Sequence, residues 1–164
     1  MSAAVYSLGV LNTGVGLPGT ISVSSGTQLR TVTCSISTES ANQTVILPTV
    51  TVRSLASAGN TAGLTSFHLD LSCAAGVSVS MTLESVAGDS GVNSVLGSTG
   101  TSSGVGIQIL DATYTAVTLH DTHKLIDSTT GNATIQFFAQ YYRLSSGLNP
   151  GSVNSAAIVT MSYQ

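Results

Sequence analysis

Two histidines and an aspartate stand within a short stretch of the chain, at His120, Asp121 and His123. Imidazole and carboxylate groups are common zinc ligands. A metal site would also need a third or fourth ligand and partners that orient the ligands. On a strand, a spacing of three places the two imidazoles on opposite faces, although a turn could bring them together. We interpret this segment as a polar surface loop, and we expect no metal and no cofactor.

The segment Gly88-Asp89-Ser90-Gly91 is similar to the sequence around the nucleophile of chymotrypsin-like serine proteases. That chemistry also needs a histidine base and an aspartate that orients it. Nothing around the histidines resembles a protease histidine segment, and the chain is too short for the usual two barrels. We interpret the segment as a turn.

Two further sequence patterns, one for dinucleotide binding and one for glycoside hydrolysis, lack the residues or elements that these functions need. The residues from Gly14 to Gly19 match GxGxxG, but the dinucleotide fingerprint needs a helix to open at that point, and no helical pattern follows. Glu39 and Glu84 are the only glutamates, and no acid pair stands out for glycoside hydrolysis. We therefore predict that the protein is not an enzyme.

The composition excludes other classes of protein. Only 7% of the residues are charged and the net charge is −3, so the chain cannot supply the basic surface that nucleic acids require. No run approaches the roughly 18 apolar residues of a membrane-spanning helix. Ser and Thr replace the missing charges, which is typical of a folded domain with a polar but uncharged surface.

The two cysteines, Cys34 and Cys73, can be interpreted in two ways. An even pair in a chain rich in Ser and Thr and poor in Lys suggests a disulfide formed in an oxidising compartment. The alternative is a pair of buried free thiols. No basic segment of a signal peptide is visible at Met1 to Ala4, so we infer export from the cysteines and the composition, and we expect the signal to have been removed or replaced.

The elements that must position these residues alternate apolar and polar side chains with a period of two. Such alternation is typical of half-buried antiparallel strands, and turn residues separate the segments. The pattern predicts an all-β sandwich with strands at 32–36, 45–52 with an interruption at Pro48, 67–73, 77–83, 105–109, 117–119, 135–141 and 157–163.

The N-terminal thirty residues differ from the rest. Ala4, Tyr6, Leu8 and Val10 alternate cleanly, and a break rich in Gly and Pro follows at 13–19. Residues 1–12 are therefore either an arm separate from the body or the first strand of the sandwich.

Several motifs of the body occur in the same order in subunits of bacterial chaperone–usher fimbriae. They are GVGIQI at 104–109, Phe-x-Ala-x-Tyr at 137–141, PGSVNSAA at 150–157 and the penultimate Tyr163, together with Cys34 and Cys73 at their spacing. The chain therefore resembles the pilin family over about residues 29–164.

The resemblance implies an immunoglobulin-like β-sandwich that lacks its last strand, with a disulfide between Cys34 and Cys73. A donor strand from a neighbouring subunit would fill the resulting groove, and a periplasmic chaperone would supply a temporary strand before an outer-membrane usher assembles the fimbrium. The last strand would line the groove and dock the chaperone through Ala157, Val159, Met161 and Tyr163. Such a subunit is secreted through the periplasm to the cell surface and mediates cell adhesion, with a host or surface receptor as a further partner.

The resemblance leaves the N-terminal part open. Ala4, Tyr6, Leu8 and Val10 fit a donor strand at 3–12, so that residues 1–28 would be an arm and residues 29–164 the pilin-type domain. More residues precede Cys34 than in ordinary pilins, however. An alternative is that the body is the anchoring domain of a two-domain tip adhesin and that residues 1–28 include its linker.

A second alternative from a different class is a self-sufficient extracellular β-sandwich. Such a lectin-like module would bind its ligand through loop residues such as His120, Asp121 and His123, and its body would be stable without an added strand.

Overall fold

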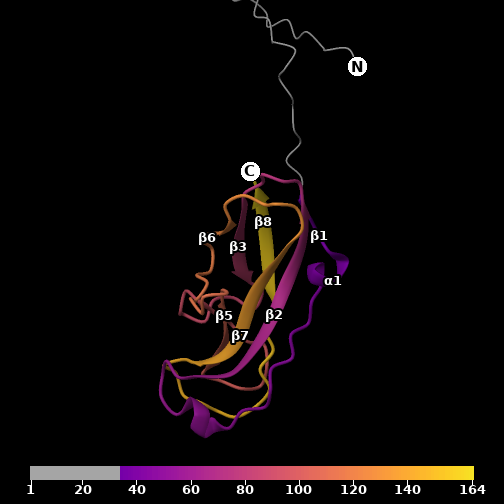
Figure 1. The fold of residues 1–164 in the computed structure, drawn as a ribbon. Helices are drawn as coiled ribbons and strands as arrows, with labels where there is room; N and C mark the ends of the chain where they lie inside the picture. Colours follow the sequence, from indigo (N-terminus) through magenta and orange to yellow (C-terminus); the bar gives the residue numbers. More distant parts are fainter. Residues whose placement is uncertain (1–33) are drawn as a thin grey trace, which may run out of the picture. The chain divides into compact units, whose positions relative to one another are not determined.

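The computed structural model describes residues 34–164, which form two antiparallel β-sheets packed against each other (Figure 1). The larger sheet has the strand order β1-β2-β7-β5-β4, and the smaller sheet has the order β6-β3-β8. The predicted all-β sandwich is confirmed. Within these residues, no helix is long and apolar enough to cross a membrane.

The larger sheet is built around two long strands, β2 (Thr61–Cys73) and β7 (Ala133–Arg143). They pair from Thr61 opposite Tyr142 to Leu71 opposite Ala133. On the far side of β7 lie β5 (Val105–Leu110) and β4 (Val95–Leu96). The short strand β1 (Cys34–Ile36) pairs with the end of β2, and the disulfide between Cys34 and Cys73 joins two directly opposed residues.

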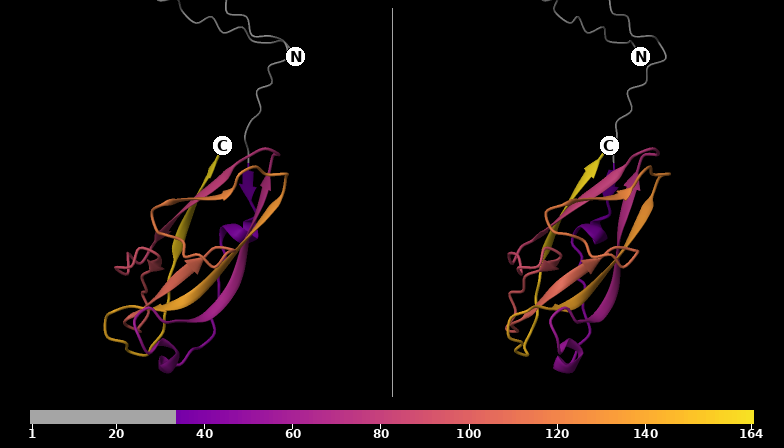
Figure 2. Two further views of the ribbon diagram at one scale, coloured as in Figure 1. Left: turned by 60° about the vertical axis from the view of Figure 1, so that its left-hand side comes forward. Right: turned by 90° about the vertical axis from the view of Figure 1, so that its left-hand side faces the viewer.

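The smaller sheet has β3 (Val79–Ser85) at its centre, with β6 (Thr122–Ile126) on one side and β8 (Ala157–Tyr163) on the other. Figure 2 shows β8 as the yellow strand that runs to the C-terminus along the edge of this layer. The strand has β3 as its partner, and its second edge is not paired within residues 34–164.

The core lies between the two sheets because the apolar residues of each strand occupy alternate positions. Phe137 is almost fully buried, and its ring stacks on that of Phe67 with 5.6 Å between the ring centroids. Met81 and Leu83 from the smaller sheet pack in the same cluster as Phe137. The core therefore receives side chains from both layers, as the alternation predicts.

The segment between β1 and β2 forms no strand. It begins with the short helix α1 (Thr38–Ala41), whose first turn is capped by the Ser37 hydroxyl, which accepts from the Ser40 amide at 3.2 Å. The buried Ser40 hydroxyl in turn accepts from the Asp70 amide of β2 at 2.9 Å, which holds α1 against the larger sheet. The chain then runs along the side of the sandwich to the 3-10 helix η1 (Val52–Leu55) at the opposite end (Figure 1).

Apart from the two-residue strand β4, which was not predicted, the structure differs from the expected strands in three places. Residues 45–51 pair with no strand within residues 34–164 and lead into η1, and residues 117–119 belong to a loop. The polar residues around His123, expected to form a loop, lie in β6. In each case the local pattern identified an apolar-alternating or a polar stretch. Whether that stretch becomes a strand depends on whether another strand lies beside it to form hydrogen bonds.

Gly63 makes a bulge in β2, where the register to β7 shifts between Ala62 and Thr65. Its φ is 71°, and a Cβ there would lie 2.9 Å from Cδ2 of Tyr141 and 3.2 Å from Cγ1 of Val50. Gly63→Ala is expected to lower the free energy of unfolding by about 3 kcal/mol, from the left-handed backbone and from overpacking. Urea unfolding followed by circular dichroism measures the change.

Gly76 provides the matched control, since its φ is 85° but nothing lies within 4 Å of a Cβ. Gly76→Ala isolates the backbone term and should cost about 1 kcal/mol. Equal losses in the two variants would show that Tyr141 and Val50 move aside freely.

Candidate functional site

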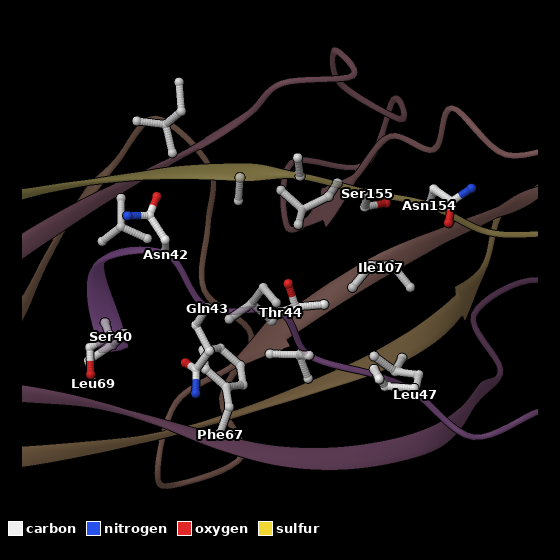
Figure 3. Close-up of a pocket in the computed structure, with 18 of the residues that line it drawn as sticks. Ser40, Asn42, Gln43, Thr44, Leu47, Phe67, Leu69, Ile107, Asn154 and Ser155 are labelled. Atoms are coloured by element: carbon white, nitrogen blue, oxygen red, sulfur yellow. The ribbon is translucent and has the colours of Figure 1, made fainter. Parts of the chain in front are cut away.

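A long groove opens between β8 and residues 42–47, with a volume of about 870 Å³. Figure 3 shows this groove, with β8 in yellow on one side and the purple segment on the other. Its floor consists of inward side chains of β2, β5 and β7, among them Phe67, Ile107, Ile109 and Tyr141. None of the described residues that line the groove is charged, so the groove suits an uncharged apolar occupant.

The strand β8 forms one wall of the groove. Its register places Val159 opposite Leu83, Met161 opposite Met81 and Tyr163 opposite Val79, so these side chains share the inward face with the core residues of β3. Ala157 has the same orientation in the alternation. Val159 is nevertheless 39% exposed, because no side chain covers it from the groove side within residues 34–164.

Residues 42–47 form the other wall. Val45 and Leu47 pack on the core, whereas Ile46 between them is exposed. No backbone group of residues 43–50 forms a backbone hydrogen bond with another described residue. The groove is therefore flanked by two unpaired lengths of backbone, which is the situation that favours addition of a strand.

Loops fix the beginning of β8 at one end of the groove. The Ser155 hydroxyl donates to the carbonyl oxygen of Gly97 at 2.6 Å, and the Asn154 amide donates to the Ser98 hydroxyl at 3.1 Å. The Thr99 amide donates to the carbonyl oxygen of Asn154 at 2.9 Å. These contacts hold β8 in place although only one of its edges is paired by the part of the chain that the structure describes.

The residues considered for a metal site do not converge. His120 has a φ of 66° and its Nε2 lies 3.1 Å from Oδ1 of Asp89, while Nε2 of His123 lies 2.8 Å from the carbonyl oxygen of Thr118. No group of three His, Cys, Asp or Glu residues within the described range could hold a metal ion. His120 thus contacts the turn at Asp89, and His123 of β6 contacts the loop at Thr118.

Ser90 forms part of a turn. Its hydroxyl donates to the carbonyl oxygen of Val95 at 2.7 Å, and Gly88 and Gly91 on either side have positive φ. The nearby His120 contacts Asp89. The motif at Gly14 to Gly19 and the donor-strand candidates Ala4, Tyr6, Leu8 and Val10 lie outside the described residues.

A second, smaller cavity of about 480 Å³ lies between the loop after β5 and β6. Burial raises the pKa of the Asp111 carboxyl there, but hydrogen bonds from the Thr113 hydroxyl and from the amides of Thr115 and Thr113 outweigh it, and the pKa is lowered. Oδ1 of Asp111 accepts all three of these bonds. This carboxylate therefore stabilises a turn.

Comparisons with known proteins agree with this geometry. The model of the fimbrial protein family matches residues 20–164. The chain belongs to the fimbrial protein family. It is a structural fimbrial subunit of the chaperone–usher type, and its two-sheet body has the immunoglobulin-like fold of pilins.

Individual fimbrial proteins are also similar to this chain. The fimbrial protein is 32% identical to the S-fimbrial protein subunit SfaA of Escherichia coli O6:K15:H31, over 100% of this chain and 97% of the relative. It is 29% identical to the type-1 fimbrial protein A chain of Escherichia coli K12, again over 100% and 97%. The crystal structure of the P pilus rod subunit PapA matches 80% of this chain and 99% of its own, with a TM-score of 0.65 and 20% identity.

Sequence reasoning found only part of the groove of this fimbrial protein. It singled out four residues of β8, of which Ala157 and Val159 line the groove while Met161 and Tyr163 pack on the core. It treated Phe67, Ile107 and Tyr141 as ordinary core positions and 45–52 as an ordinary strand. The signal available in the sequence was Pro48, which interrupts the alternation and cannot donate to a neighbouring strand.

Proposed function

We propose that the groove accepts a β-strand from another fimbrial subunit and that this addition links subunits into the fimbrium. One observation carries the proposal: within residues 34–164, β8 presents an unpaired edge directly beside an uncharged apolar groove. An added strand would satisfy backbone groups on both sides and cover the apolar floor. Main-chain hydrogen bonds would supply affinity, and the alternate side chains of the strand would supply specificity.

The side chains of β8 that face the groove would contact the added strand. Ala157, Val159, Met161 and Tyr163 alternate along the inward face of β8, and the first two of them line the groove, so a strand laid there would meet Ala157 and Val159. The same edge would dock a periplasmic chaperone before assembly, and an outer-membrane usher would exchange the chaperone strand for the subunit strand. The role is structural and adhesive, without catalysis, in a fimbrium at the cell surface.

The donor would be the N-terminal segment of a neighbouring copy. Residues 3–12 alternate apolar side chains at Ala4, Tyr6, Leu8 and Val10. In this division of the chain, residues 1–28 are the arm and residues 29–164 the body that receives the strand. The uncharged lining of the groove supports this choice, because residues 3–12 carry no charge either.

Removal of residues 1–12 tests the role of the arm. The full chain, expressed in the periplasm, is expected to form stable oligomers or chaperone complexes in native mass spectrometry. The chain without residues 1–12 is expected to remain monomeric and to unfold at a lower temperature until a synthetic peptide of residues 1–12 is added.

Two results would contradict the proposal. A shortened chain that is a stable monomer without affinity for the peptide would indicate a complete sandwich, as in a self-sufficient binding module. Oligomers that persist unchanged without residues 1–12 would show that another segment is the donor.

A further inference from the structure

Two large apolar side chains stand on the solvent side of the groove, one on each wall. Ile46 is 83% exposed and Ile158 is 55% exposed. Both border the groove. Single exposed apolar residues are normal on protein surfaces, so the exposure alone requires no explanation. What calls for one is that these two flank the same opening.

Each side chain points away from the core for a clear reason. Ile158 is opposite the exposed Glu84 of β3, which places it on the outward face of β8 beside the inward Val159. Ile46 lies between Val45 and Leu47, which both pack on the core. A strand laid in the groove would direct every second side chain outward, into the space between Ile46 and Ile158.

We propose that Ile46 and Ile158 form an apolar rim that recognises the outward-facing side chains of the donor strand, for which the proposed function takes residues 3–12 of a second copy of this chain. The inference rests on the proposed function. Ile46 and Ile158 would contact the outward side chains of the donor, whereas the floor of the groove would contact only its inward side chains.

The sequence of the segment outside the described residues supports this occupant. In residues 4–11 the phase opposite to Tyr6 and Leu8 also carries two large apolar side chains, Val5 and Leu11, with Ser7 and Gly9 between them. A strand intended only to fill the floor would need apolar residues in one phase. At about 3.3 Å per residue, eight residues span about 26 Å, which is close to the length of the seven residues of β8.

The test uses the full chain and the rate at which its assembled oligomers dissociate in moderate urea, followed by native mass spectrometry. Ile46→Thr and Ile158→Thr keep a β-branched side chain but remove the apolar contact. Each is expected to speed dissociation about fivefold to tenfold. Val86→Thr is the matched control, because Val86 is 60% exposed and does not line the groove, and its rate should equal that of the unmodified chain.

Substitutions in the donor identify the occupant. At least one of Val5→Thr and Leu11→Thr should speed dissociation to a similar extent. When that substitution is combined with Ile158→Thr, the dissociation rate should rise by less than the product of the two single fold-changes. Unchanged rates in both rim variants, or effects that multiply fully in every combination, would overturn the inference.

The outcomes separate the rim from the groove itself. If the full chain forms oligomers that Val159→Asp abolishes, and Ile46→Thr and Ile158→Thr leave their dissociation rate unchanged, only the rim inference fails. If the full chain forms no oligomers, or if the Val159→Asp variant still forms them, the proposed function fails as well.

Discussion

Val159→Asp is expected to abolish assembly of the full chain while leaving the body folded. Val159 faces the groove from the middle of β8 and is 39% exposed in the described structure. An aspartate at this position can therefore reach water in the free subunit. An added strand would bury its carboxylate against an uncharged floor, at a cost of several kcal/mol, which weakens association by more than about 100-fold.

Thr160→Asp is the matched control, because it adds the same charge one residue along the strand. Thr160 pairs with Thr82 on the outward face of β8 and is exposed. Size-exclusion chromatography and native mass spectrometry should show monomers for Val159→Asp and oligomers for Thr160→Asp. Oligomers from both variants would mean that the β8 groove is not where subunits join.

Replacement of both cysteines, Cys34→Ser with Cys73→Ser, is expected to lower the free energy of unfolding by about 4 kcal/mol. The disulfide joins residues 39 apart, and a cross-link of that length restricts the unfolded chain by about this amount. It also holds β1, which is only three residues long, on the end of β2. The midpoint of thermal unfolding should fall by about 10 °C.

The neighbouring pair Ser35 and Ser72 separates the effect of the cross-link from that of local packing. The Ser35 hydroxyl donates to the carbonyl oxygen of Ser72 at 3.4 Å and the Ser72 hydroxyl donates to Oδ1 of Asn132 at 2.9 Å, so replacing both serines by Ala removes two exposed hydrogen bonds and should cost no more than about 2 kcal/mol. Treating the unmodified protein with a reductant should reproduce the loss seen in the double cysteine variant. An unfolding midpoint that is insensitive to both treatments would contradict the prediction.

The parts of the fold that sequence predicts well are those where burial on one face dictates the pattern. The segments 67–73, 77–83, 105–109, 135–141 and 157–163 all lie within strands or adjoin them, because each has one face in the core. Phe137 and Met81 follow from the same alternation.

The rest could not be read from local pattern because it depends on tertiary contacts. β4 has only two residues, too few to show a period, and it exists because β5 lies beside it. β6 carries the polar residues Thr122 and Lys124 and pairs with β3 at an edge. Residues 45–52 have the composition of a strand but no partner in residues 34–164, which is why the groove became visible only in the structure.

The position of the disulfide has a mechanical consequence. Tension on the chain ahead of Cys34 enters the body at this residue and passes through the sulfur bridge to Cys73 at the end of β2. There β2 is held to β7 by the longest ladder among the described strands, and because its hydrogen bonds lie perpendicular to the strands, a pull along β2 loads them together. The short β1 is bypassed, so a subunit stretched within a fimbrium would not unravel from its first strand.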